Sequence, residues 1–135
     1  MKNIQTALNK PKTNTSAKWA SVGAIISIII ITVLEFPAPV GFETRPQTNV
    51  SPFWLLFFLI IVITEIAAIP LILKRPSLGK KFGIVAGVLN ILQVIADQAH
   101  LLQPEVAPLG YSVLEGLVVI ASLVLIYYSL KIQEA

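Results

Sequence analysis

Four long apolar stretches alternate with short polar or proline-containing stretches along the 135-residue chain. Each apolar stretch is long enough, as a helix, to cross a hydrocarbon core of about 30 Å. Short connectors favour antiparallel packing of consecutive helices. The sequence therefore predicts an all-α integral membrane four-helix bundle with up-down-up-down order, a single transmembrane domain over residues 18–131, with helices at about residues 18–36, 53–74, 82–102 and 111–130.

Polar tails flank this domain at residues 1–17 and 132–135. We expect residues 1–17 to form a short, poorly ordered cytoplasmic tail. The first apolar stretch could instead belong to a cleaved signal peptide, because a basic leader precedes it. Its apolar run is long for that role, however, and Pro37-Ala38-Pro39 is a poor cleavage site. We therefore interpret this stretch as a retained helix.

The longest connector, residues 37–52, contains four prolines. Proline lacks a backbone N–H and clashes with the preceding helical turn, so a helix cannot continue through this connector. Long loops in compact domains are often functional or disordered. Two interpretations stay open, a lid over the bundle and a solvated connector.

The chain has few charged residues, and its Lys and Arg residues are unevenly distributed across the membrane. Only 13% of the residues are charged and mean hydropathy is +0.81, whereas soluble domains carry about 25% charged residues. Nine of the ten Lys and Arg residues lie on one side of the membrane if both termini are cytoplasmic, and only Arg45 lies on the other. By the positive-inside rule, we predict a multi-pass protein of the cell membrane, an inner membrane in a two-membrane cell, with cytoplasmic N and C termini. The basic residues interleave with no aromatic motif, so the lipid bilayer, and no nucleic acid, is the predicted partner.

The residue counts also exclude several chemistries. The chain has no cysteine, which excludes disulfides, thiolate catalysis and iron–sulfur ligation by cysteine. With one His and one Met, a bis-His haem within one chain is excluded. The sequence identifies no cofactor.

A polar stripe runs along the third apolar stretch. Asn90, Gln93, Asp97 and His100 are spaced 3, 4 and 3 residues apart, which places all four on one face of an α-helix. Polar side chains inside a membrane face the bundle interior or a water-filled cavity. We therefore expect the stripe to point inward, with Ile91, Ile95 and Leu102 turned more toward lipid.

The polar residues of all four helices fall at two depths. At 1.5 Å per residue, one layer lies within about 8 Å of the outer surface and a second about 14–18 Å down. Together they predict a polar cavity that opens outward and is closed toward the cytoplasm. The outer layer contains Glu35, Asp97, His100 and Glu115; the deeper layer contains Glu65, Asn90 and Gln93.

Candidate roles follow from these positions, each with a structural alternative. Glu65, Asp97 and His100 are the candidate catalytic, proton-handling groups. Glu65 could equally be a protonated acid that only fixes helix register, because an ionised carboxylate at mid-membrane costs several kcal/mol. The candidate ligand-binding residues, which could instead be interhelical or interfacial structural residues, are Asn90, Gln93, Glu115, Glu35, Trp54 and Tyr111.

The chemistry of the expected cavity is asymmetric. It contains carboxyl groups but no Lys or Arg, which suits a proton, a cation or a neutral ligand with donor groups, and does not suit an anion. The Asp97/His100 spacing opposite Glu115 could also bind a metal ion. Because the set contains a single His, we predict no metal site.

The run Glu65-Ile66-Ala67-Ala68-Ile69-Pro70-Leu71-Ile72-Leu73, a basic turn and a small-residue-rich third helix together resemble the DoxX-like four-helix membrane proteins. The resemblance covers roughly residues 60–102. It implies a compact bundle associated with quinone-linked or small-lipophile chemistry. A weaker resemblance is to sterol-isomerase-like four-helix enzymes, which line an intramembrane pocket with Glu, His, Asn and Trp.

Three functional hypotheses follow. The first is an accessory membrane subunit that binds a small lipophile such as a quinone. The second is an intramembrane acid/base enzyme in which Glu65 or Asp97 exchanges protons with the substrate and His100 relays them. The third is a small proton-coupled exporter that works as a dimer, although small multidrug exporters carry their essential Glu on the first helix. A homo-oligomer and a membrane partner subunit both stay open.

Overall fold

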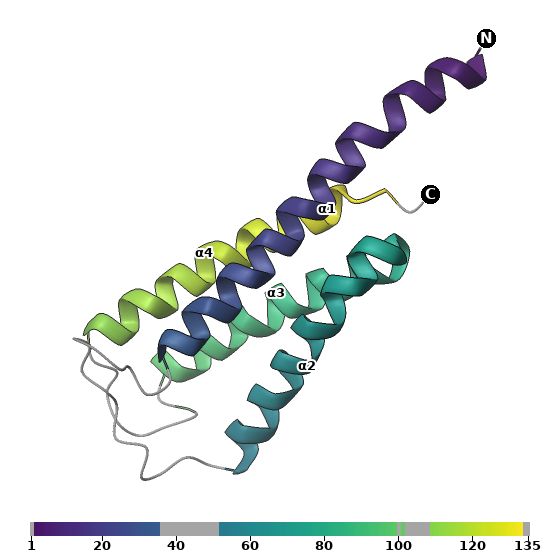
Figure 1. The fold of residues 1–135 in the computed structure, drawn as a ribbon. Helices are drawn as coiled ribbons and strands as arrows, with labels where there is room; N and C mark the ends of the chain where they lie inside the picture. Colours follow the sequence, from purple (N-terminus) through teal and green to yellow (C-terminus); the bar gives the residue numbers. More distant parts are fainter. Residues whose placement is uncertain (1, 36–51, 100, 102–108, 134–135) are drawn as a thin grey trace.

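Four helices form an up-down bundle in the computed structural model (Figure 1), as the hydropathy pattern predicts. The structure describes residues 2–35, 52–99, 101 and 109–133, and side chains within these ranges except those of residues 2–14 and Tyr111. Each helix contains a segment long and apolar enough to cross a membrane. The helices are α1 (Lys2–Glu35), α2 (Pro52–Lys74), α3 (Pro76–Gln98) and α4 (Leu109–Lys131).

Helix α1 is longer than the apolar pattern predicts. It begins at Lys2, so helical geometry extends through the residues expected to be a poorly ordered tail. Its candidate membrane span is only Thr15–Glu35, and the helix projects beyond the other three at its N-terminal end (Figure 1). Hydropathy identifies the part of a helix that lies in lipid, but it does not mark where the helix itself begins.

Helix α3 begins six residues earlier than expected, at Pro76 instead of Phe82. The expectation that residues 75–81 form a turn was wrong, because proline at the first helical position starts a helix instead of breaking it. The connection is reduced to Arg75, whose backbone N–H donates to the Leu71 carbonyl at 2.7 Å and whose carbonyl accepts from Gly79 at 2.8 Å. Helices α2 and α3 therefore form a very tight hairpin.

Small residues on α3 allow its neighbours to approach closely. A Cβ atom added to Gly79 would overlap the backbone of Ile72 on α2. A Cβ atom on Gly87 would lie 2.6 Å from Ile126 Cγ1 and 3.0 Å from the Ser122 carbonyl on α4, and one on Gly83 would overlap Ser129. The glycines of α3 therefore bring α2 to one side of the helix and α4 to the other.

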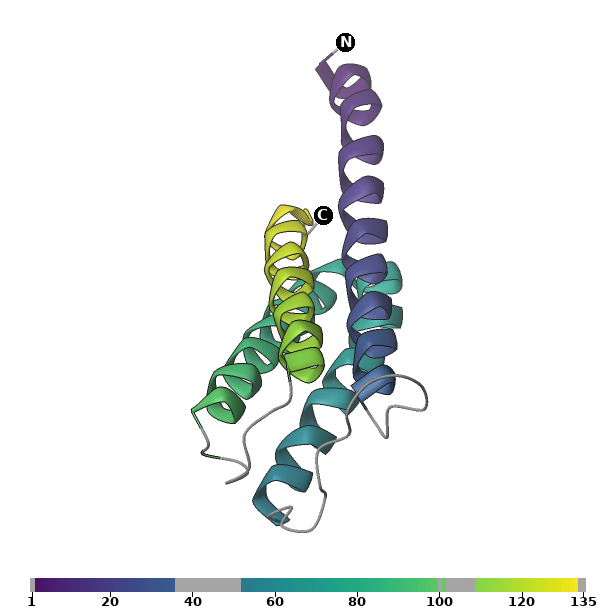
Figure 2. The same cartoon turned by 90° about the vertical axis from the view of Figure 1, so that its left-hand side faces the viewer.

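Helix α1 packs mainly on α4, and it has far fewer contacts with α2. Figures 1 and 2 both show the start of α2 set apart from the end of α1. The bundle is thus held as a chain of neighbours, α2 on α3, α3 on α4 and α4 on α1, with its weakest seam between α1 and α2.

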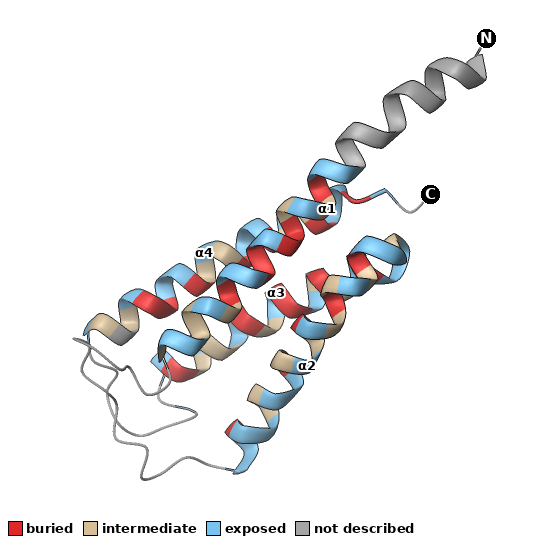
Figure 3. Cartoon of the chain, viewed as in Figure 1, coloured by how far each residue is buried: buried red, intermediate tan, exposed pale blue. Residues whose placement is uncertain are grey.

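Buried residues follow the inward faces of the helices, and exposed residues cover the outside (Figure 3). The inner cluster is aliphatic, with Ile25, Ile28, Ile72 and Leu125 fully buried. Large apolar side chains such as Ile63 and Ile120 are more than half exposed. An outer surface this apolar is compatible with lipid, where every backbone polar group is satisfied within a helix.

The close approach at Gly79 generates a stability prediction. Gly79→Ala should lower the free energy of unfolding by about 1–3 kcal/mol, because the α2 backbone must move to admit the methyl group. The matched control is Gly23→Ala, since a Cβ atom there meets nothing within 4 Å. Because alanine has a higher helix propensity than glycine, this variant should have unchanged stability or a gain of up to about 1 kcal/mol. Unfolding of both variants in mixed detergent gives the comparison, and equal stabilities would contradict the packing described.

Candidate functional site

A buried hydrogen bond joins α2 to α3 at the middle of the bundle. Glu65 and Asn90 are only 2% and 3% exposed, and Asn90 Nδ2 donates to Glu65 Oε1 at 2.6 Å. The expectation that Asn90 is a partner of Glu65 is confirmed, because the tight hairpin holds both residues at one depth. Gln93 was expected to be a second partner, but it is half-buried and makes no hydrogen bond to Glu65 among the described residues.

The geometry at Asn90 fixes the hydrogen-bonding role of each Glu65 oxygen. Asn90 Nδ2 also donates to the Ala86 carbonyl at 2.9 Å, so both amide hydrogens are used. Glu65 Oε1 is thereby committed as an acceptor. The other oxygen, Oε2, is the one that can carry a proton or accept a hydrogen bond from a further group.

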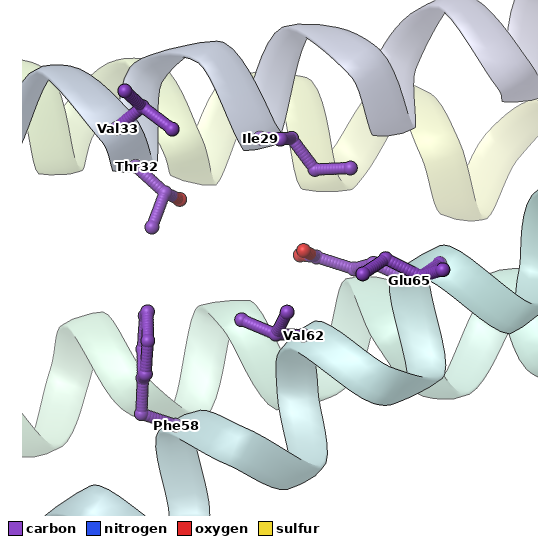
Figure 4. A pocket seen from close by; sticks show the side chains of 7 residues that line it. Ile29, Thr32, Val33, Phe58, Val62 and Glu65 are labelled. Carbon is purple, nitrogen blue, oxygen red and sulfur yellow. The ribbon is translucent and has the colours of Figure 1, made fainter.

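The Glu65 carboxyl group points into a cavity of about 320 Å³ between α1 and α2 (Figure 4). Val33 and Ile66 at its edge are 63% and 58% exposed, so the cavity opens on the lipid-facing side of the bundle. The described residues that line it are Ile29, Thr32, Val33, Phe58, Val62, Glu65 and Ile66.

This cavity differs from the polar, outward-opening pocket expected from the sequence. Glu65 and Thr32 are the only polar side chains among its described lining residues. The Thr32 hydroxyl donates to the Ile28 carbonyl of its own helix at 2.8 Å, which leaves its oxygen as an acceptor. The difference arises because the polar stripe of α3 faces α2 and α4, whereas the open seam lies between α1 and α2.

A second carboxyl cluster brings together residues of α1, α3 and α4. Asp97 and Glu115 are each 5% exposed, and their side chains are close enough to interact electrostatically. Gln98 Nε2 donates to Glu115 Oε2 at 2.5 Å. Glu35 is close enough to interact electrostatically with both acids, and its Oε1 is buried without a hydrogen-bond partner among the described residues.

The structure therefore brings together Glu35, Asp97 and Glu115, as the depth calculation predicts. No group of three His, Asp or Glu side chains in the described part of the chain has the geometry to hold a metal ion. His100, the predicted relay, lies outside the described residues.

The aromatic candidates have different outcomes. Trp54 is 4% exposed, and its ring stacks on Phe58 with the centroids 5.4 Å apart. Because Phe58 lines the cavity, Trp54 supports the cavity wall from within the bundle and does not line the cavity. Phe53, also at the start of α2, is 69% exposed. Tyr111 lies in α4, but its side chain is outside the described part.

Sequence analysis missed Gln98 and the apolar lining of the cavity. Gln98 falls outside the spacing that defines the stripe, although an amide next to Asp97 could have been recognised as a donor for Glu115. Ile29, Phe58 and Val62 carry no such signal, because a cavity wall and a packed core use the same side chains.

Comparison with known proteins gives no relative. No protein-family model, curated protein or solved structure matches the chain.

The buried pair generates a prediction about stability. Asn90→Leu should lower the free energy of unfolding by about 1–3 kcal/mol, because the buried Glu65 carboxyl group loses its donor. The double variant Glu65→Leu/Asn90→Leu should be closer to wild type, since no buried polar group is left unpaired. Gln93→Leu, one turn along the same helix, is the control and should have a small effect. Unfolding measurements in which the double variant loses more than Asn90→Leu alone would contradict the pairing.

Proposed function

We propose that this small four-span membrane protein binds a small lipophile in the cavity between α1 and α2, with Glu65 as the polar contact. The supporting observation is the cavity itself, which combines an apolar wall, one buried carboxyl group and an opening between two helices. Ligand sites in proteins typically have volumes of about 300–1,000 Å³ and few polar groups. The cavity volume of about 320 Å³ suits a ring-sized group.

Glu65 offers a ligand two kinds of contact. When protonated, Oε2 donates a hydrogen bond, which suits a carbonyl group. When ionised, Oε2 accepts one, which suits a hydroxyl or ammonium group. A quinone and its quinol present these two complementary groups, and a lipophile of this class can enter from the bilayer past Val33 and Ile66. The DoxX-like resemblance points to the same class of ligand.

Binding is favoured over acid/base catalysis by the distribution of ionisable groups. Among the described residues, Glu65 is the one ionisable side chain that lines the cavity. Asp97 and Glu115, the other buried acids, interact with each other and do not line this cavity. We therefore propose a binding role, as an accessory subunit that works with a membrane partner, instead of an isomerase or a proton-coupled exporter.

We also propose that the protein lies in the cell membrane with both termini in the cytoplasm. Lys74 ends α2, Arg75 connects it to α3, Lys80 and Lys81 lie near the start of α3, and Lys131 ends α4. The acidic cluster of Glu35, Asp97 and Glu115 lies toward the opposite end of the bundle. This separation of charge supports the orientation by the positive-inside rule.

Filling the cavity tests the proposed function. Val62→Trp should abolish binding of a short-chain quinone or quinol, measured by calorimetry in mild detergent, because the indole occupies the space of the ligand ring. Ile63→Trp is the matched control: it adds the same side chain on the same helix at a position 57% exposed. Its binding should equal that of wild type.

The same titration is repeated over a range of pH with Glu65→Gln. Wild-type affinity should depend on pH, because Oε2 changes between donor and acceptor, whereas the affinity of Glu65→Gln should be independent of pH, because the amide does not titrate. Undiminished binding by Val62→Trp, or no binding of either ligand by a folded wild type, would contradict the proposal. Thermal melting provides the folding control for all variants.

Topology is tested by single-cysteine labelling, for which the cysteine-free chain is well suited. A cysteine in place of Thr48, in the first connector and outside the described residues, should react with a membrane-impermeant reagent in intact cells. A cysteine in place of Ser77, near the start of α3, should react only after the membrane is opened. The reverse labelling pattern would contradict the proposed orientation.

A further inference from the structure

A second cavity, of about 270 Å³, lies between α1 and α4 where the membrane-spanning part of α1 begins and α4 ends. It involves neither Glu65 nor the α1–α2 seam, so it is separate from the lipophile site proposed above. Its described lining residues are Ser16, Ala17, Tyr127, Tyr128 and Lys131.

The polar groups of this cavity are suited to an anion. One ammonium group and three hydroxyl groups line it, all of which can donate hydrogen bonds, and there is no carboxylate among its described lining residues. Lys131 Nζ lies 4.7 Å from the centroid of the Tyr127 ring, and the Tyr127 and Tyr128 rings pack edge to face at 5.1 Å. These contacts hold the ammonium group beside the cavity.

The charged residues around this cavity are basic, like Lys131. Lys18 directly follows the cavity-lining Ala17. The end of α2, its connection to α3 and the start of α3 lie at the same end of the bundle, and they carry Lys74, Arg75, Lys80 and Lys81. In the described part of the chain, the acidic residues lie at mid-membrane or toward the other end. An anion approaching this end of the bundle is therefore attracted before it reaches Lys131.

The depth of this cavity in the membrane indicates which anion it would bind. The candidate membrane span of α1 begins at Thr15, and that of α4 ends at Lys131. The cavity therefore lies where both segments meet the headgroup region. Tyr and Lys are typical of this interface. Below it, α4 presents exposed Leu123, Val124 and Leu130 to lipid, along which acyl chains can lie.

We propose that this cavity binds the phosphate group of a membrane phospholipid, with Lys131 pairing with a phosphate oxygen and the Ser16 and tyrosine hydroxyls as further donors. The acyl chains stay in the bilayer against α4. The site would hold a lipid of the leaflet that faces the basic end of the bundle.

The test is titration of the delipidated full chain with a short-chain phosphatidylglycerol, followed by native mass spectrometry. Lys131→Gln should weaken binding about tenfold or more, as expected for loss of a charge-assisted hydrogen bond. The matched control is Lys81→Gln, which removes the same charge at an exposed position outside the cavity lining. Lys81 contributes only screened, long-range attraction, so its loss should change affinity less than about twofold. Lys131→Arg should retain binding, because it keeps the charge.

Two further ligands identify what is recognised. Diacylglycerol of equal chain length lacks the phosphate and should bind at least about tenfold more weakly than phosphatidylglycerol. Inorganic phosphate should not displace the lipid at matched concentration. Each of three results would overturn the proposal. Equal losses in Lys131→Gln and Lys81→Gln would assign the binding to general surface charge, and equal binding of diacylglycerol would assign it to the acyl chains. Displacement by inorganic phosphate would assign the site to soluble phosphate.

Discussion

The hydrogen bond from Asn90 to Glu65 is the interaction on which the proposed site depends. Neither side chain can reach water from the middle of the bundle, so each polar group needs a partner within the protein. The bond meets this requirement for both, and it joins α2 to α3 beyond their one-residue connection. Because Asn90 donates its second hydrogen to Ala86, Glu65 is left with one oxygen for other partners. The bond thus serves as a register contact and as the support of a candidate binding group.

The remaining packing determines where that oxygen points. Glycines on α3 allow close contact with α2 and α4, and α1 packs mainly on α4. The seam between α1 and α2 is therefore the least closely packed of those between neighbouring helices, and Glu65 faces it (Figure 4). The result is an apolar wall with a single carboxyl group, and this combination is the basis for proposing a lipophile with one polar head as the ligand.

Sequence patterns predicted the parts of this arrangement that depend on periodicity and depth. The 3, 4, 3 spacing on α3 places Asn90 and Asp97 inside the bundle, and helix rise brings Glu35, Asp97 and Glu115 to one level. The start of α3 was mispredicted because Pro76 has opposite effects at the first turn and within a helix. The cavity could not be predicted, because its location depends on which pair of helices packs least, and apolar residues such as Val62 are equally suited to a core or a cavity wall.

The most direct test of the account is a measurement of the Glu65–Asn90 contact in lipid bilayers. Solid-state NMR can detect the dipolar coupling between ¹³Cδ of Glu65 and ¹⁵Nδ2 of Asn90 in selectively labelled protein. The account predicts a clear coupling, as required by an N···O distance of 2.6 Å, and a change in the Glu65 ¹³Cδ shift when a quinone or quinol is added. Absence of the coupling in folded protein would contradict the central contact, and an unchanged shift at saturating ligand would contradict the role of Glu65 in binding.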